Sequence, residues 1–477
     1  MLKKIFLFVG ISGLVFFTSC KKWLDVQPED RFTEPQVFQD EAGARLALNG
    51  LYLNLASAGL YGNNLSMGTI EIFAQRYNIS TQHLRAQFQV YNYSDEAVMA
   101  TMDQIWTNAY VTILNANEFL KNLDKYPGII HPERESIMRG EAVAIRALLH
   151  FDMLRLFGPR YNTADSVNES IPYYTAATKA IQPLLPANEV LNRVEADLAQ
   201  AEQLLQNDPI IANGVLPGML GDPNDFFRNR NQRMNFYAVK ALQARVYLYR
   251  GKKQDALASA KYVIDNASPW FPWVSPSEIV SDRNNPNRIM SSEVLFAVMS
   301  IDLYETSRSL FSSDLPDGSI LAPNDTRLKN IFESNENDYR YNPNWILSGA
   351  SKSYKTFHKY NDVIDKNKSF RYLIPLIRIS EMYYIAAECE TDAAAAISLI
   401  NTVRYNRGLT DLPPTANVNT ELMKEYQKEF FGEGQLFYYY KRRNTTSVPN
   451  SAATSGNTTL NAAKYVVPLP LSETTYR

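Results

Sequence analysis

Three carboxylate side chains near the end of the sequence have a spacing that could serve catalysis. Glu425, Glu429 and Glu433 recur at four-residue steps, which places them on one face of a helix. A glycoside hydrolase needs a pair of such carboxyl groups, and spacing alone does not exclude partners that are distant in the sequence. Because Lys424 and Lys428 lie beside the glutamates, we interpret this face as solvated and linked by salt bridges rather than as catalytic.

The histidine and cysteine residues do not form a recognisable metal site. His83, His131, His150 and His358 lie far apart, with no His-x-x-x-His spacing and no cysteine nearby, so no metal is predicted. Each histidine is expected on the surface or as a hydrogen-bonded imidazole in the core. Cys389 lies in an alanine-rich apolar stretch and is expected to be a buried structural thiol.

Motifs of common enzyme classes are also missing from the sequence. After residue 19 there is no Gly-x-Ser-x-Gly motif of hydrolases, no phosphate-binding glycine loop and no dinucleotide fingerprint. No cofactor is therefore predicted, and the chain is expected not to be an enzyme.

Aromatic residues offer a different chemistry, the binding of flat apolar surfaces. Tyrosine, phenylalanine and tryptophan make up 12% of the chain, and tyrosine dominates with 29 copies against 5 tryptophans. An aromatic ring complements the C–H face of a sugar, and the polar edge of tyrosine or tryptophan bonds to hydroxyl groups. The rings that we predict to contact a ligand are Tyr77, Trp270, Trp273, Tyr339, Tyr341 and Trp345.

These rings also have a simpler interpretation. Long irregular segments pack their own aromatic side chains as local cores, and for any single ring we favour this outcome. We nevertheless expect at least two or three aromatic rings of the irregular segments to form an exposed platform. The exposure of each ring in the structure bears directly on this choice.

The charge balance restricts the class of partner. Of 477 residues, 48 are basic and 50 are acidic, which gives a formal charge of −2. Binding to a phosphate backbone requires a clustered excess of lysine and arginine, so no nucleic-acid partner is predicted. With 45% hydrophobic residues, the chain can form two or three domains, or one large scaffold with insertions.

The N-terminus has the features of a lipoprotein signal peptide. Two lysines precede an apolar run over residues 5–17, which is too short to span a bilayer. Residues 17–20, Phe-Thr-Ser-Cys, are similar to a loose lipobox, so we predict a signal peptide over residues 1–19 and lipidation of Cys20. Residues 20–35 would form a tether. The alternative is an uncleaved membrane anchor at the N-terminus.

Helical periodicity dominates much of the remaining chain. A first amphipathic helix is predicted from residue 36 to about residue 57. Its apolar stripe would consist of Phe38, Ala42, Leu46, Asn49 and Leu53. Later helices pair into hairpins: Gly251 is expected to end one helix in a left-handed conformation, and Asp392 is expected to cap another.

The hairpins and their small residues indicate degenerate tetratricopeptide units, each of which buries its apolar face by stacking on the next. We therefore predict a mainly α fold with a single domain over residues 36–477. The helical scaffold would cover residues 36–60, 98–158, 188–206, 233–266 and 371–440. Long irregular insertions, over about 61–97 and 267–370, would carry the ligand site.

Several sequence segments resemble one known family, the SusD/RagB-like outer-membrane nutrient-binding lipoproteins of Bacteroidetes. The start of the mature chain is similar, with Cys20-Lys21-Lys22-Trp23-Leu24-Asp25-Val26-Gln27-Pro28 followed by Ala47-Leu48-Asn49-Gly50-Leu51-Tyr52. Further similar segments are Arg146-Ala147-Leu148-Leu149-His150-Phe151, Leu156-Phe157-Gly158, Ile171-Pro172-Tyr173, Ala241–Tyr249, Ile377–Glu388, Asn401-Thr402-Val403-Arg404 and Val467-Pro468-Leu469-Pro470.

This resemblance implies a SusD-like helical scaffold of four tetratricopeptide-like units and a non-enzymatic function. It implies a lipid-anchored protein of the outer membrane, exposed at the cell surface, that binds oligosaccharides and delivers them to a SusC-like TonB-dependent transporter. It assigns no ligand-binding residues, because these vary within the family. A peptide-binding uptake protein of the same architecture stays open as an alternative, followed by a glycoside hydrolase.

Overall fold

The structure is a computed structural model that describes residues 33–219, 222, 225–348 and 352–477. The predicted signal peptide, the lipidation at Cys20 and the tether up to residue 32 lie outside the described residues. At its C-terminal end the predicted tether differs from the structure, because helix α2 (Glu34–Val37) already begins at residue 34 and Thr33 donates its backbone N–H to Gln36 Oε1 at 2.7 Å.

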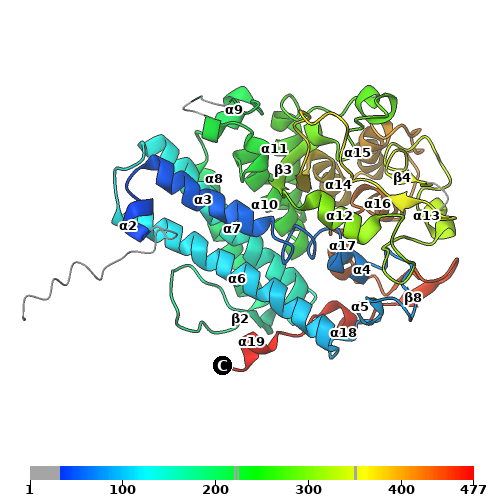
Figure 1. The fold of residues 1–477 in the computed structure, drawn as a ribbon, viewed down its shortest axis with the longest axis horizontal. Helices are drawn as coiled ribbons and strands as arrows, with labels where there is room; N and C mark the ends of the chain where they lie inside the picture. Colours follow the sequence, from blue (N-terminus) through cyan, green and yellow to red (C-terminus); the bar gives the residue numbers. More distant parts are fainter. Residues whose placement is uncertain (1–32, 220–221, 223–224, 349–351) are drawn as a thin grey trace, which may run out of the picture.

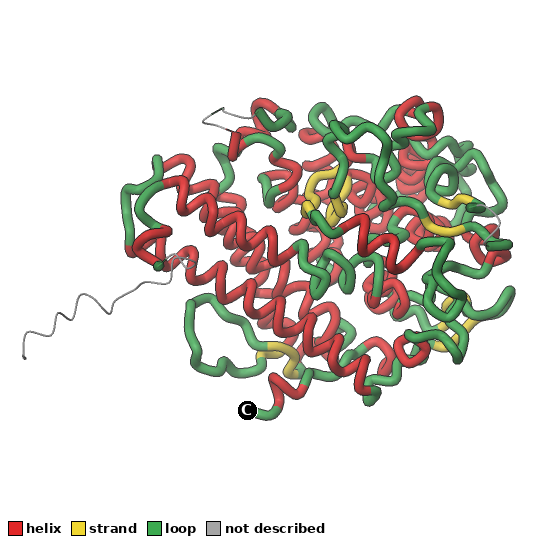
Figure 2. Tube along the Cα trace, viewed as in Figure 1, coloured by secondary structure: helices red, strands yellow, loops and turns green. Residues whose placement is uncertain are grey.

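The predicted mainly α fold is confirmed, because helices form the bulk of the described chain and strands are short (Figures 1 and 2). The scaffold helices are α3 (Glu41–Leu55), α6 (Glu96–Lys125), α7 (Pro132–Phe157), α8 (Ala187–Leu204), α10 (Phe236–Arg250), α11 (Lys253–Ala267), α14 (Ile379–Cys389), α15 (Ala393–Tyr405), α16 (Val418–Glu429) and α17 (Leu436–Arg442). Helices that follow one another along the scaffold pack side by side, from α3 and α6 at the left of Figure 1 toward α14, α15 and α16 at the right.

Shorter elements connect the scaffold helices. The short helices and helical turns are α4 (Thr69–Phe73), α5 (Ala86–Gln89), η1 (Asp165–Val167), α9 (Pro209–Asn213), η2 (Asp225–Phe227), η3 (Arg230–Gln232), η4 (Ser277–Ser281), η5 (Ser291–Glu293), α12 (Leu303–Phe311), α13 (Asp325–Ile331), α18 (Ala462–Tyr465) and α19 (Leu471–Thr474). The strands form antiparallel pairs: β1 (Glu169–Ile171) with β2 (Leu185–Pro186), β3 (Val294–Met299) with β6 (Leu373–Arg378), β4 (Trp345–Ile346) with β5 (Thr356–Phe357), and β7 (Ser447–Pro449) with β8 (Asn457–Thr459).

The local signals that define the hairpins are confirmed. Gly251 follows α10 with φ +83°, and its N–H donates to the carbonyl of Leu248 at 3.1 Å. Only a residue without a side chain adopts this left-handed conformation at low cost, so the chain reverses here into α11. Asp392 accepts hydrogen bonds from the N–H groups of Ala394 and Ala395 and thereby caps α15.

The first predicted helix forms over Glu41–Leu55 as α3, but the helix is interrupted at residues 38–40, between α2 and α3. The predicted apolar stripe is also wrong for most of its length. Leu46 and Leu53 are 69% and 67% exposed, whereas Leu48 and Leu51 are buried. The sequence of α3 has leucines on both faces, so periodicity alone did not show which face is covered. Packing of α3 against α6 and α7 decides it.

The glutamates with four-residue spacing form salt bridges as expected, but they are not solvated. Glu425, Glu429 and Glu433 are 0%, 2% and 3% exposed. They lie in a buried ion network that we define by its acidic members, which also include Glu293 and Asp338, and by its basic members, which are Arg340, Lys359, Arg378, Arg404, Arg407 and Lys428. The network joins α16 to residues from the irregular segments that are more than 80 positions away in sequence, such as Arg340.

Glu429 is at the centre of the buried ion network. Its carboxylate accepts hydrogen bonds from Arg407 Nη2 at 2.6 Å, from Arg340 Nη1 at 3.0 Å and from Arg378 Nη1 at 2.5 Å. Burial raises the pKa of Glu429, but the charges of Arg378 and Arg407 outweigh burial and hold the pKa well below its usual range. The carboxylate is therefore ionised at neutral pH, where the guanidinium groups need it.

Neutralising Glu429 tests the importance of this network. In Glu429→Gln, three buried guanidinium groups lose much of their compensating charge, so the free energy of unfolding should fall by about 3–5 kcal/mol. Urea denaturation followed by circular dichroism measures this change. Glu118→Gln, which alters an exposed pair with Lys121, is the matched control and should stay within about 0.5 kcal/mol of the wild type. Equal stability of both variants would contradict the role given to Glu429.

The ionised, buried carboxylate of Glu425 should make the free energy of unfolding depend on pH in acid. Burial raises its pKa, but Arg340 and Lys428 outweigh burial and lower the pKa from 4.5 to about 2. A depressed pKa contributes stability that is present above pH 4.5 and is lost as the pH falls toward 2. The free energy of unfolding of Glu425→Gln should therefore depend less on pH across this interval than that of the wild type. Parallel curves for the two proteins would show that Glu425 does not contribute.

Candidate ligand-binding site

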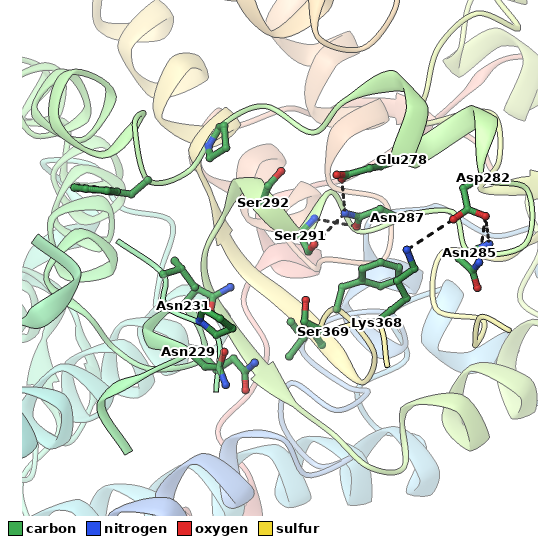
Figure 3. A pocket seen from close by; sticks show the side chains of 17 residues that line it. Asn229, Asn231, Glu278, Asp282, Asn285, Asn287, Ser291, Ser292, Lys368 and Ser369 are labelled. Atoms are coloured by element: carbon green, nitrogen blue, oxygen red, sulfur yellow. Dashed lines mark hydrogen bonds and ion pairs between the residues drawn. The ribbon is translucent and has the colours of Figure 1, made fainter. Parts of the chain in front are cut away.

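A pocket of about 480 Å³ lies where the irregular segments meet the end of α11 (Figure 3). The described residues of its walls come from separate parts of the chain: residues 215–217, residues 229–232, residues 270–272, residues 278–292 and residues 368–373. The predicted ligand-binding insertions thus supply part of the wall. Residues 215–217 and 229–232 and Leu373 lie outside the two insertions that were predicted to carry the ligand site, and the described lining includes no residue of 61–97.

The buried ion network holds two walls of the pocket in place. Arg407 binds Glu293, the last residue of η5, through Nη1 at 2.9 Å and Nη2 at 2.6 Å. Glu293 Oε1 also accepts the backbone N–H of Val274 at 3.2 Å. These bonds fix η5, which supplies two serines to the pocket, and the chain that follows Trp270.

Trp270 lies in the wall beside a close backbone contact. The backbone N–H of Trp270 donates to the carbonyl of Ala267, the last residue of α11, at 2.9 Å. Gly214, with φ +65°, approaches the indole so closely that a Cβ atom there would lie 2.5 Å from Trp270 Cε3. A side chain at position 214 would therefore displace the indole, and glycine permits both the conformation and the contact.

Some polar side chains in the pocket are held by one another. The side chain of Asn287 accepts the backbone N–H of Ser291 at 3.0 Å and donates to Ser291 Oγ at 3.0 Å and to Glu278 Oε2 at 3.4 Å (Figure 3). Asn285 Oδ1 accepts the backbone N–H of Asp365 at 2.7 Å. These bonds stiffen the wall formed by residues 278–292. They leave little hydrogen-bonding capacity on the amide of Asn287.

Other polar side chains of the pocket have no partner among the described residues. The amides of Asn231 and Gln232 make no side-chain hydrogen bond, and Ser292 Oγ is buried without one. A buried hydroxyl without a partner is unfavourable. A ligand that presents hydroxyl groups would supply the missing donors and acceptors.

The structure separates the six predicted aromatic residues into three groups. Trp270 lines the pocket and is half-buried. Tyr77, Tyr341 and Trp345 are 0%, 2% and 1% exposed, so their prediction as exposed stacking surfaces is corrected. They pack as local cores: Trp345, for example, contacts Phe357 and Phe431 with ring centroids 4.7 Å apart in both pairs.

Trp273 and Tyr339 are half-buried but lie elsewhere. The guanidinium of Arg407 lies 5.3 Å from the ring centroid of Trp273, and Tyr339 packs against a small cluster that contains Val274 and Met290. Neither lines the pocket. Phe370 does line it, and sequence reasoning missed this ring because a single phenylalanine in a polar stretch carries no distinguishing pattern.

His150 and Cys389, which were considered from the sequence, are both buried. His150 is fully buried, its Nδ1 donates to the carbonyl of Arg146 at 2.9 Å, and its Nε2 accepts the backbone N–H of Tyr174 at 3.1 Å. Because its Nε2 is an acceptor, Nδ1 carries the proton and donates. Burial lowers the pKa of His150 to about 3 and raises the pKa of the Cys389 thiol to about 11. Cys389 is the buried thiol that the sequence predicted.

In the described part of the chain, no three histidine, cysteine, aspartate or glutamate side chains are grouped so that they could hold a metal ion. Within the same residues, no helix combines the length and the apolar character that crossing a bilayer requires.

Comparisons with solved structures show the fold. A SusD superfamily protein from Bacteroides thetaiotaomicron aligns with a TM-score of 0.70 at 19% sequence identity, covering 91% of this chain and 98% of that chain. A laminarin-binding SusD-like protein aligns with a TM-score of 0.63 at 18% identity, covering 91% of this chain and 97% of that chain.

Comparisons of sequence point to the same family. SusD-like protein P38 from Formosa agariphila is 23% identical over 483 residues, which cover 90% of this chain and 88% of that protein. A family model described as starch-binding and associating with the outer membrane matches residues 22–213, and the SusD family model matches residues 323–467. The two matches together span most of the sequence, and the chain belongs to the SusD/RagB-like family.

Proposed function

We propose that this protein binds oligosaccharides in the pocket beside Trp270 without cleaving them. One observation carries the proposal: an indole shares a pocket wall with polar groups, on Asn231, Gln232 and Ser292, that lack partners within the described chain. The family description and the laminarin-binding neighbour support carbohydrate as the ligand class.

The composition of the pocket suits a sugar. Trp270 and Phe370 offer apolar rings for the C–H groups of a pyranose, while amides and a hydroxyl can bond to its hydroxyl groups. The volume of about 480 Å³ is typical of a site for a small ligand. Because the ion network fixes the pocket walls before binding, less conformational entropy is lost when the ligand enters.

We further propose delivery of the bound oligosaccharide to a SusC-like TonB-dependent transporter. Lipidation of Cys20 would hold the protein on the outer membrane, exposed at the cell surface, within reach of that transporter. The family description, which associates its members with the outer membrane, supports this location.

Replacing the indole tests the proposed site. Trp270→Ala should weaken oligosaccharide binding about tenfold or more, because the stacking surface is lost, while the circular dichroism spectrum is unchanged. A glycan array identifies a ligand, and calorimetry measures its affinity. Tyr405→Ala is the matched control, since Tyr405 is 75% exposed and does not line the pocket.

Three results would contradict this function. Unchanged affinity in Trp270→Ala would reject the pocket. Selective binding of peptides and of no glycan would favour the peptide-binding alternative. Release of shorter sugars, abolished in Glu278→Gln, would show a glycoside hydrolase, because Glu278 lines the pocket.

Replacing the lipidated cysteine tests the location and the partner. Cys20→Ala should move the protein from the membrane fraction to the soluble fraction, since no acyl chain is then attached. The wild type, isolated from mildly solubilised outer membranes of its natural host, should co-purify with a TonB-dependent transporter. The proposal fails if the wild type fractionates with soluble proteins or if no such transporter accompanies it.

A further inference from the structure

We propose that the pocket selects neutral oligosaccharides over those that carry carboxylate or sulfate groups. The inference rests on the proposed function and adds the charge class of the ligand. It derives from the charged side chains that line the pocket, which are Glu278, Asp282 and Lys368.

The lining residues carry an excess of negative charge. Lys368 is the only basic residue among the described lining residues, and its Nζ lies 3.8 Å from Asp282 Oδ2. The positive charge is therefore already matched by a carboxylate. Glu278 accepts only a long hydrogen bond, 3.4 Å from Asn287 Nδ2, and its negative charge has no basic partner among the described residues. Figure 3 shows Glu278, Asp282 and Lys368 around the same pocket.

Three arginines close to the lining residues in sequence form ion pairs with aspartates that do not belong to the charged lining. Arg228 binds Asp222 at 2.8 Å, Arg230 binds Asp208 at 2.6 Å, and Arg371 binds Asp362 at 2.8 Å. Arg283 and Arg288 form no ion pair among the described residues, but neither lines the pocket. An anionic ligand would thus enter without a free guanidinium, the group that most often binds carboxylates and sulfates in proteins.

The same arrangement favours hydroxyl groups. A carboxylate is only an acceptor, so Glu278 can bind the hydroxyl protons of a sugar but repels another anion. The unpartnered amides of Asn231 and Gln232 can both donate and accept hydrogen bonds, which suits a hydroxyl group of the ligand more than an anionic group. Glu278 therefore attracts neutral sugars and disfavours uronates and sulfate esters at the same position.

A matched pair of ligands tests this selectivity. Laminarihexaose, maltohexaose and mannohexaose are the neutral probes, and the tightest binder is also prepared with its primary hydroxyls oxidised to carboxylates. Calorimetry at low ionic strength should show at least about tenfold weaker binding of the oxidised form. Added salt should reduce this difference, because it screens the repulsion.

Variants separate the inference from the proposed function. Glu278→Gln should reduce the ratio of the affinities for the neutral and the oxidised form about threefold or more. The matched control Glu118→Gln, on α6 and outside the pocket, should leave this ratio unchanged. Trp270→Ala should weaken the binding of both forms. If the neutral form binds through Trp270 but the oxidised form binds as tightly, or if Glu278→Gln keeps the full preference, the inference is overturned and the function stands. If none of the three neutral probes binds, the proposed function and the charge preference are both rejected for these sugars.

Discussion

The buried charge pairing around Glu429 is the interaction on which the rest of this structure depends. Guanidinium groups from Arg340, Arg378 and Arg407 meet on one carboxylate, and each would be costly to bury alone. The three arginines come from segments that are distant from one another in sequence, so the network ties the irregular insertion that contains Arg340 to α16. Through Arg407 and Glu293 the same network reaches η5 and the pocket wall.

Buried ion pairs also join other helices of the scaffold. Arg146 binds Asp197 between α7 and α8 at 2.7 Å, and Arg245 binds Glu381 between α10 and α14 at 2.6 Å. Apolar packing supplies most of the favourable free energy of such a scaffold, but it is weakly directional. A buried ion pair with bidentate geometry is satisfied in one arrangement only, which is a physical reason for the defined positions of neighbouring helices here.

The aromatic residues divide between two roles according to their neighbours. Tyr77 and Trp345 occur in the two aromatic-rich insertions, over 61–97 and 267–370, and fill their interiors, because a long insertion must still bury apolar surface. Trp270 follows a scaffold helix and is held against Gly214, so its indole reaches a pocket wall. The ligand site thus depends on a few rings at the junction of scaffold and insertion, within a chain that uses most of its aromatic residues for the core.

The sequence by itself determined the features that depend on near neighbours in the chain. The helix ends at Gly251 and Asp392, the hairpins, the mainly α class and the buried Cys389 follow from local spacing, and the family segments follow from their order along the chain. Tertiary structure decided which leucines of α3 are covered, that Glu425 and Glu429 are buried, and which of six rings reaches the pocket. Burial depends on contacts between residues far apart in sequence, such as Arg340 with Glu429 or Gly214 with Trp270, and periodicity carries no information about them.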